Sequence, residues 1–253
     1  MNKNANTSKK SLSRHSAVVF GVGAVNGLGA ALARRFAREG LHVFLAGRTE
    51  AKVRAVAEEI QREGGKAEAR VANATCEADV IALLEEACDG ASLDLVAYNV
   101  GNNVAAPLLE LTADLFEAAW RQNALGGFLV GREAVRRMLP QGHGTLLYTG
   151  ATASMRARPP FTAFAAAKAA LRAVAQGIAR EYGPKGIHVA HVVIDGVIEG
   201  DYAKSRFPDF VKAKGPDGLL KVDEIADAYW ALHRQPKSAW TQELDLRPFK
   251  EPF

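Results

Sequence analysis

The sequence lacks the features that mark several large classes of protein. Its 253 residues contain only two cysteines, Cys76 and Cys88, too few for a disulfide framework, and neither has His or Cys companions at zinc-ligand spacing. No run approaches the ~20 apolar residues of a membrane-spanning helix. The basic N-terminus is not followed by the apolar segment of a secretory signal. These absences favour a cytoplasmic protein without a membrane segment or a metal site.

Most of the chain also has no excess of positive or negative charge. The net charge is +4, but four of the 32 Lys and Arg residues lie in residues 1–16, which contain no acidic residue. The rest of the chain therefore carries 28 basic and 28 acidic side chains. A neutral body offers no general attraction to nucleic-acid phosphates. We predict a disordered basic tail over residues 1–16, one folded domain over residues 17–253, and no nucleic-acid partner.

The chain does have a regular alternation of short apolar runs and helical patterns from residue 17 onward. Repeated strand–helix alternation implies right-handed crossovers and a mostly parallel sheet covered by helices on both faces. Residues 200–220 are the least periodic segment and fit either a mobile lid or a surface excursion. The basic pairs at 34–35 and 136–137 are interpreted as solvated helix faces. The predicted strands are 17–22, 41–46, 67–71, 93–98, 145–148 and 187–194, and the predicted helices are 27–39, 50–63, 76–88, 112–138 and 161–182.

A glycine cluster follows the first predicted strand. Gly23, Gly27 and Gly29 bridge the end of this strand and the start of the next helix. Glycine lets the backbone turn sharply and approach a pyrophosphate, to which the helix N-terminus presents unpaired N–H groups and its positive dipole end. Because the cluster opens the first β-α-β unit of an alternating chain, it predicts a dinucleotide site. Asn26 and Leu28, in the same turn, are included among the predicted cofactor contacts.

The end of the second predicted strand distinguishes NAD from NADP. An acidic residue there would accept hydrogen bonds from the adenosine ribose and select NAD. This sequence has Arg48 instead. A guanidinium can bind a 2′-phosphate through charge-assisted, forked hydrogen bonds. We therefore predict NADP(H) as the cofactor, the alternative being a solvated arginine at a helix start.

Further residues complete a pattern that resembles a known family. Asn99 and Gly101 follow the fourth predicted strand, and Asn123 and Lys168 lie in two later helices. With the glycine cluster and Arg48, they resemble the short-chain dehydrogenase/reductase family over residues 17–245, and Asn123 and Lys168 match its active-site asparagine and lysine. The resemblance implies a single-domain Rossmann-type α/β fold with a doubly wound, seven-stranded parallel sheet, a small-molecule substrate and a homodimer or homotetramer. The predicted cofactor-binding residues are Gly23, Asn26, Gly27, Leu28, Gly29, Arg48, Asn73, Ala74, Asn99, Gly101 and Lys168.

The sequence departs from that family at the proton donor. The family has a tyrosine four residues before the lysine and a serine thirteen residues before the tyrosine, where this sequence has Phe164 and Ala151. Related enoyl reductases place the tyrosine seven residues before the lysine, where this sequence has Phe161. Losing a positioned general acid typically lowers the rate by about 10²–10⁴-fold.

Other polar residues near these positions are candidate substitutes for the donor, although each also suits a turn or a core. Two interpretations stay open. One is an NADP(H)-dependent oxidoreductase that transfers hydride to or from a small carbonyl or activated double bond with a non-standard proton donor. The other is a catalytically silent NADP(H)-binding sensor or subunit. The predicted catalytic set is Lys168, Asn123 and Thr152, and the further candidates are Tyr148, Ser154, His191 and Asp195.

Overall fold

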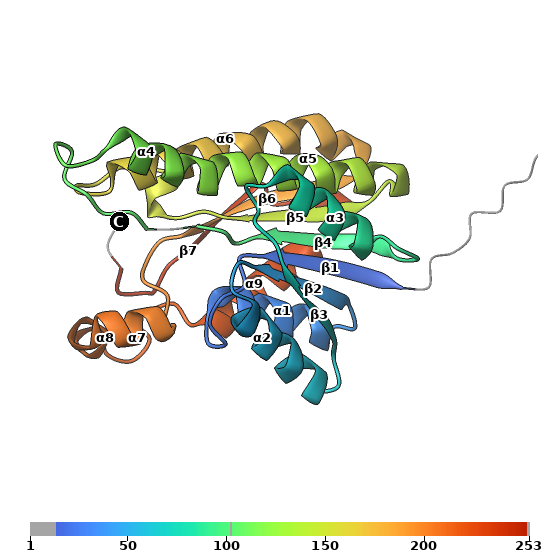
Figure 1. Cartoon of the computed structure of the whole chain (residues 1–253), viewed down its shortest axis with the longest axis horizontal. Helices are drawn as coiled ribbons and strands as arrows, with labels where there is room; N and C mark the ends of the chain where they lie inside the picture. The colour runs from blue at the N-terminus through green and yellow to red at the C-terminus, as the bar shows by residue number, and fades with distance from the viewer. Residues whose placement is uncertain (1–13, 102, 252–253) are drawn as a thin grey trace, which may run out of the picture.

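Seven strands, all parallel, form the centre of the structure (Figure 1). The computed structural model describes residues 14–101 and 103–251. The order β3-β2-β1-β4-β5-β6-β7 reverses between β1 and β4, as in doubly wound folds. The predicted single-domain Rossmann-type α/β fold is confirmed. The strands are β1 His15–Phe20, β2 His42–Gly47, β3 Lys66–Val71, β4 Ser92–Tyr98, β5 Gly144–Thr149, β6 Ile187–Ile194 and β7 Glu243–Leu246.

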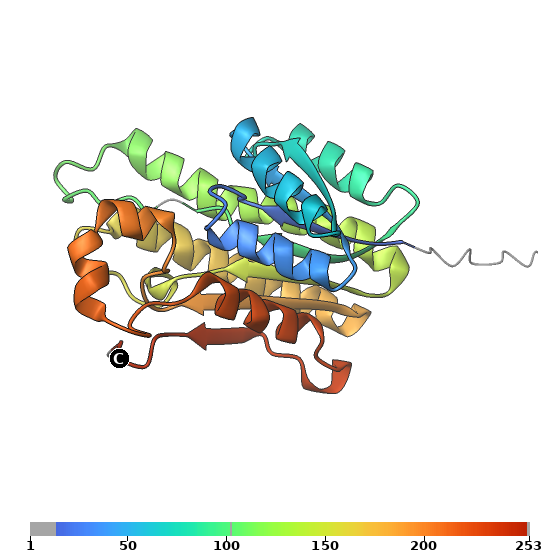
Figure 2. The ribbon, with the colours of Figure 1, turned by 90° about the horizontal axis from the view of Figure 1, so that it is seen from below.

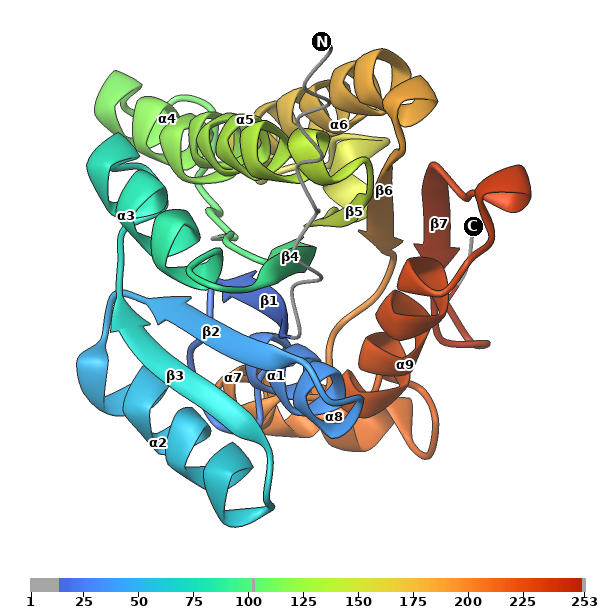
Figure 3. The same ribbon diagram turned by 90° about the vertical axis from the view of Figure 1, so that its right-hand side faces the viewer.

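Helices cover both faces of the sheet (Figure 3). On one face α1 Leu28–Arg38, α2 Glu50–Arg62 and α9 Val222–His233 enclose one apolar core. On the other face α3 Glu77–Ala87, α5 Gly126–Met138 and α6 Thr162–Tyr182 enclose a second, and α4 Ala113–Trp120 precedes α5. All eight residues of β6 are buried, as expected for a parallel strand covered on both sides. No helix in the described part of the chain is long and apolar enough to cross a bilayer.

The first strand differs from its predicted bounds at both ends. It ends at Phe20 because Gly21 turns the chain with a φ of +91°. It begins at His15, and the next residue, Ser16, is buried with its hydroxyl donating to the Ala87 carbonyl at 2.6 Å. Two residues of the predicted tail therefore belong to β1, and residues 1–13 lie outside the described residues.

The segment 200–220 is more regular than its sequence pattern suggests. It forms two short helices, α7 Asp201–Arg206 and α8 Pro208–Lys214, at the end of the molecule where the strands have their carboxyl ends (Figure 2). The pattern also misses α9 and β7, and β7 is only four residues long and half exposed. The short 3-10 turns are η2 Leu139–Gln141, η3 Thr152–Ser154, η4 Gly183–Lys185 and η5 Lys237–Ala239.

The predicted solvated basic faces are wrong for one member of each pair. Arg34 is largely buried and donates to the Val25 carbonyl at 2.8 Å. Arg137 is also largely buried, and it bonds to the carboxylate of Glu133 at 2.8 Å. Arg136 remains exposed but also bonds to Glu133 at 2.8 Å. The side chain of Glu133 is 1% exposed, so its carboxylate is buried. It forms ion pairs with three arginines of the same helix, Arg132, Arg136 and Arg137.

This cluster makes stability depend on pH. Burial alone would raise the pKa of Glu133, but hydrogen bonds from Arg137 and Arg132 hold it below its ordinary value. A carboxyl whose pKa is lower in the folded state stabilises the fold above its unfolded pKa and loses this contribution as pH falls. We expect Glu133→Gln to lower the free energy of unfolding by about 1–3 kcal/mol at pH 7, and this difference to shrink below about pH 4. Urea denaturation at both pH values measures it.

Glu117→Gln is the matched control. Glu117 is 67% exposed and lies 3.7 Å from Arg121 on the same helix surface, where an ion pair contributes little. Equal losses in both variants, or a Glu133→Gln loss that does not depend on pH, would contradict the assignment.

Candidate functional site

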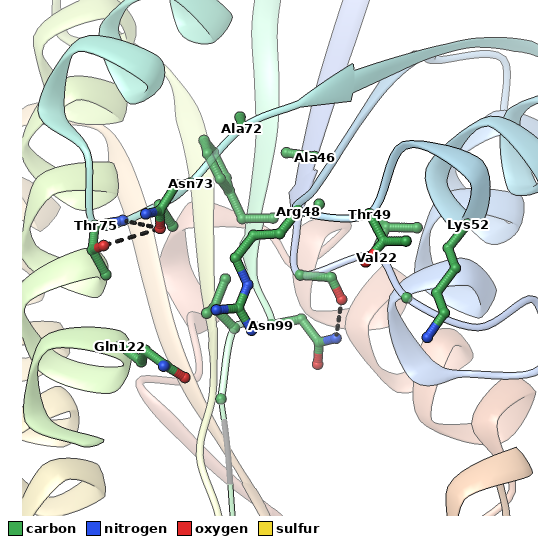
Figure 4. A pocket seen from close by; sticks show the side chains of 17 residues that line it. Val22, Ala46, Arg48, Thr49, Lys52, Ala72, Asn73, Thr75, Asn99 and Gln122 are labelled. Atoms are coloured by element: carbon green, nitrogen blue, oxygen red, sulfur yellow. Dashed lines mark hydrogen bonds between the residues drawn. The ribbon is translucent and has the colours of Figure 1, made fainter. Parts of the chain in front are cut away.

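A pocket opens at the carboxyl ends of β1 to β4, where the strand order reverses (Figure 4). In open α/β sheets this crevice is where ligands bind. The pocket brings together six of the predicted cofactor contacts, which come from four separate strand ends: Gly23, Arg48, Asn73, Ala74, Asn99 and Gly101.

The glycine cluster allows close backbone packing around this pocket. A Cβ on Gly29 would lie 2.5 Å from the Gly21 carbonyl oxygen, and one on Gly47 would lie 2.3 Å from the Val22 carbonyl oxygen. A Cβ on Gly23 would meet nothing within 4 Å, so this residue borders open space. Gly27 is the N-cap of α1, and no side chain caps that helix. The first N–H groups of α1 are therefore available to an anion.

Arg48 shares the pocket wall with a second cation, Lys52, which the sequence pattern did not predict. Both lie at the junction of β2 and α2 (Figure 4), and Lys52 stands four residues after Arg48. Lys52 lies in the first turn of α2, so its place directly after the second strand is the signal in the sequence. Two cations at this strand end suit a dianionic phosphate better than an isolated arginine does.

Two predicted contacts in the glycine turn lie differently from the others. The side chain of Leu28 is buried in the core, so a contact from this residue would come from its backbone. The amide nitrogen of Asn26 donates to Asp201 of α7 at 3.1 Å. This bond ties the glycine turn after β1 to α7.

Asn73 and Asn99 hold the pocket walls in place (Figure 4). The Oδ1 of Asn73 accepts from the backbone N–H of Thr75 at 3.1 Å and from its hydroxyl at 2.9 Å. The side-chain amide of Asn99 donates to the Gly21 carbonyl at 3.2 Å, and its Oδ1 accepts from the Thr149 hydroxyl at 3.1 Å. Asn99 thus links the turn after β1 to the end of β5.

The predicted lysine and asparagine meet beside Gly101, which lines the pocket. Lys168 is 4% exposed, and its Nζ donates to the Thr149 carbonyl at 2.8 Å. Asn123 lies in the π-helical turn η1 Arg121–Leu125 between α4 and α5, and its Oδ1 is buried with no partner among the described residues. A Cβ on Gly101 would lie 3.0 Å from Lys168 Nζ and 3.1 Å from Asn123 Oδ1, so all three residues converge.

Burial lowers the pKa of Lys168 to about 8 because the ammonium loses most of its hydration. The ring of Phe164, one helical turn earlier, has its centroid 5.8 Å from Lys168 Nζ. Lys168 therefore lies beside an apolar ring and can exchange a proton near neutral pH.

The predicted catalytic Thr152 has a defined partner. Its hydroxyl donates to the buried carboxylate of Asp195, which also forms ion pairs with Arg156 at 3.4 Å and Arg247 at 3.2 Å. An ionised carboxylate only accepts hydrogen bonds, so the Thr152 proton points at Asp195 and the oxygen offers its lone pairs to other groups. The orientation of the Thr152 hydroxyl is therefore fixed by Asp195.

Other candidate donors are engaged elsewhere. The Tyr148 hydroxyl is fully buried and donates to the Gly127 carbonyl at 3.0 Å. The Ser154 hydroxyl oxygen accepts from the Ala151 backbone N–H at 3.1 Å. His191 is buried beneath Gly150, behind the end of β5. The described residues contain no group of three or more His, Cys, Asp or Glu side chains placed to hold a metal ion.

Comparison with known proteins agrees with this geometry. Residues 17–209 match a family model described as short chain dehydrogenase. The chain belongs to this family. A short-chain dehydrogenase from Rhodopseudomonas palustris has a solved structure that is 40% identical, with a TM-score of 0.80, and the match covers 93% of this chain and 99% of that one. Membership places the chain among the short-chain oxidoreductases.

Two further relatives carry more specific names. Gluconate 5-dehydrogenase of Gluconobacter oxydans is 28% identical over 227 residues, which cover 88% of this chain and 82% of that protein. A gluconate 5-dehydrogenase from Burkholderia cenocepacia, solved in complex with NADP and tartrate, is 26% identical with a TM-score of 0.80 and covers 93% of this chain and 94% of that one.

The lowered pKa of Lys168 predicts a rise of stability with pH. The folded protein releases this proton near pH 8, whereas the unfolded chain keeps it to about pH 10.4. Between these values the unfolded state binds more protons, so the free energy of unfolding gains a contribution that increases with pH. Lys168→Met should remove this contribution, and urea denaturation at pH 7.5, 9 and 10.5 measures it. The exposed Lys185→Met should retain it; parallel pH profiles for wild type and Lys168→Met would refute the burial argument.

Proposed function

We propose that this chain is an NADP(H)-dependent oxidoreductase that transfers hydride to or from a small carbonyl or an activated double bond, with a proton donor other than the family tyrosine. One observation carries the proposal. Gly23, beside the uncapped N-terminus of α1, lines one pocket with the cations Arg48 and Lys52 and with Gly101. Gly101 in turn packs against the buried Lys168 and Asn123.

The residues present fit a phosphorylated dinucleotide. Gly23 leaves open space beside the N-terminus of α1, where a pyrophosphate would approach the backbone. Arg48 and Lys52 would hold the 2′-phosphate. The B. cenocepacia relative, crystallised with NADP, supports this cofactor preference.

When bound, the nicotinamide supplies or accepts the hydride, and the protein orients it and manages the proton. Lys168 would hold the ribose hydroxyls and keep a proton at Nζ, and Asn123 Oδ1 would accept a hydrogen bond beside it. Thr152 Oγ1, polarised by Asp195, would contact the reacting oxygen. In the oxidation direction an alcohol proton would pass to Thr152 Oγ1 as the Thr152 proton moves to Asp195 Oδ1, and reduction would reverse these transfers.

The substrate we propose is a small polar alcohol or carbonyl compound. Relatives named gluconate 5-dehydrogenase and glucose 1-dehydrogenase support this class. We also propose a homodimer or homotetramer, supported by the apolar side chains that α4 and α5 leave partly exposed: Phe116, Trp120 and Phe128.

Coenzyme selection tests the phosphate end of the pocket. We expect Arg48→Ala to weaken NADPH binding about tenfold or more, because one charge-assisted forked contact is lost, and to leave NADH binding within twofold. Isothermal calorimetry with both coenzymes measures this. Arg54→Ala, on the exposed surface of α2 beside Glu50, is the control and should change neither affinity. Equal weakening of both coenzymes would contradict the assignment of Arg48.

Turnover tests the proton route. We expect NADPH oxidation with a panel of aldehydes, ketones and enones, and we expect Thr152→Val to lower kcat about 10²-fold or more because it removes a group that passes a proton. Thr152→Ser keeps the hydroxyl and should recover most of the rate. The double variant Ala151→Ser/Phe164→Tyr installs the family's residues. Activity that appears only in this double variant would show that the natural chain is a silent NADP(H)-binding protein.

A further inference from the structure

A partly buried network of His191, Glu243 and Arg172 lies between β6, β7 and α6. His191 of β6 is 0% exposed and stands in register with Glu243 of β7. The Nδ1 of His191 lies 3.0 Å from Glu243 Oε2. Arg172 of α6 forms a two-bond contact with the same carboxylate, from Nε at 2.6 Å and from a terminal nitrogen at 2.7 Å. None of these residues takes part in the reaction proposed above.

These contacts determine the form of the imidazole. A carboxylate only accepts hydrogen bonds, so the His191 hydrogen lies on Nδ1 and the Nε2 atom carries a lone pair. Burial lowers the pKa of His191 to about 4, which keeps the ring neutral. The Nε2 atom is buried and has no hydrogen-bond partner among the described residues.

The free edge of the ring lies directly against Gly150. A Cβ on Gly150 would lie 2.3 Å from His191 Nε2 and 2.4 Å from Cε1, so the imidazole fills the space that any side chain at position 150 would need. Gly150 also donates from its N–H to the Val192 carbonyl of β6 at 2.7 Å. The start of the loop after β5 is therefore packed against the ring of His191.

The same stretch of backbone holds the lysine. The carbonyl of Thr149 belongs to the peptide bond that joins Thr149 to Gly150, and it accepts the hydrogen bond from Lys168 Nζ at 2.8 Å. It is the only hydrogen bond of this ammonium group within the described residues. A shift of this peptide would therefore leave a buried cation without its acceptor, which is costly.

We propose that His191, held by Glu243 and Arg172, is a positioning residue for Lys168: its ring braces the Thr149–Gly150 peptide, whose carbonyl orients the ammonium group. This assignment rests on the role of Lys168 in the proposed function. It also accounts for the glycine at position 150, because the ring fills the space that a side chain there would need.

The charges around the ring are consistent with this role. Lys168 and Arg172 face it from α6, Glu243 faces it from β7, and Tyr148 of β5 turns its hydroxyl away to Gly127. A second cation at His191 would oppose the nearby ammonium group, whereas the neutral ring does not.

Two substitutions test whether the ring must both pack against Gly150 and be held by Glu243. His191→Phe keeps a ring but removes both nitrogens, whereas His191→Asn keeps a donor near the Nδ1 position for Glu243. The titration midpoint of Lys168 is followed by NMR of ¹⁵Nζ-labelled lysine, with Lys168→Met used to assign the signal. The affinity for NADPH at pH 7 is followed in parallel by fluorescence.

We expect His191→Phe to move the Lys168 midpoint down by at least half a pH unit and to weaken NADPH binding several-fold, because the ammonium loses its aligned acceptor. His191→Asn keeps the donor to Glu243 but loses the ring edge that packs against Gly150, so it should also lower the midpoint and weaken NADPH binding. His188→Phe is the control, since His188 lies on the same strand, stacks on Trp240 and bonds to the Thr241 carbonyl. It should leave the Lys168 midpoint unchanged.

A folded His191→Phe protein with a wild-type midpoint would overturn the proposal, as would an equal shift in His188→Phe. If His191→Phe does not fold, Glu243→Leu decides: it removes the carboxylate that holds the ring and should lower the midpoint, and an unchanged midpoint would refute the role. Wild type that binds neither NADPH nor NADH would refute the proposed function alone, because the lysine titration reports on the brace without a coenzyme.

Discussion

The close approach of backbone to backbone at the first turn is the contact on which the rest of the site depends. Gly29 lies so near the Gly21 carbonyl, and Gly47 so near the Val22 carbonyl, that side chains at these positions would meet backbone atoms. α1 can therefore begin directly beside the end of β1 with its N-terminal N–H groups uncapped. Because the strands are parallel, the ends of β2, β3 and β4 lie at the same edge and complete the pocket.

Buried charge is treated in two different ways in this molecule. Glu133 is surrounded by arginines, and their hydrogen bonds outweigh the cost of burying the carboxylate. Lys168 has one carbonyl acceptor and an apolar ring beside it, and the cost of its burial lowers its pKa. The first arrangement favours stability. The second keeps an ionisable group responsive near neutral pH, as groups that exchange protons in enzymes are.

Much of the fold was predictable because its signals are local. The periodicity of the sequence predicts the ends of β6 and α6 to within one residue, and the glycines predict the turn after β1. The signals failed where tertiary packing decides. The sequence pattern does not predict α9 or β7, and β7 is a short edge strand that carries little periodicity. Arg34 and Arg137 resemble surface residues until their buried partners are known. The sequence pattern does not predict Lys52, although it lies in the first turn of the helix that follows the second strand.

The amino-acid sequence by itself determined the α/β architecture, the position of the glycine turn after β1, and the absence of hydroxyl groups at positions 151 and 164. These follow from periodicity and residue type, which act over a few residues. Only the tertiary structure decided which polar groups meet: Thr152 with Asp195, Asn123 with Lys168 across Gly101, and His191 with Glu243 beneath Gly150. Such pairs join residues far apart in the chain, and their geometry is set by how helices and strands pack rather than by local preference.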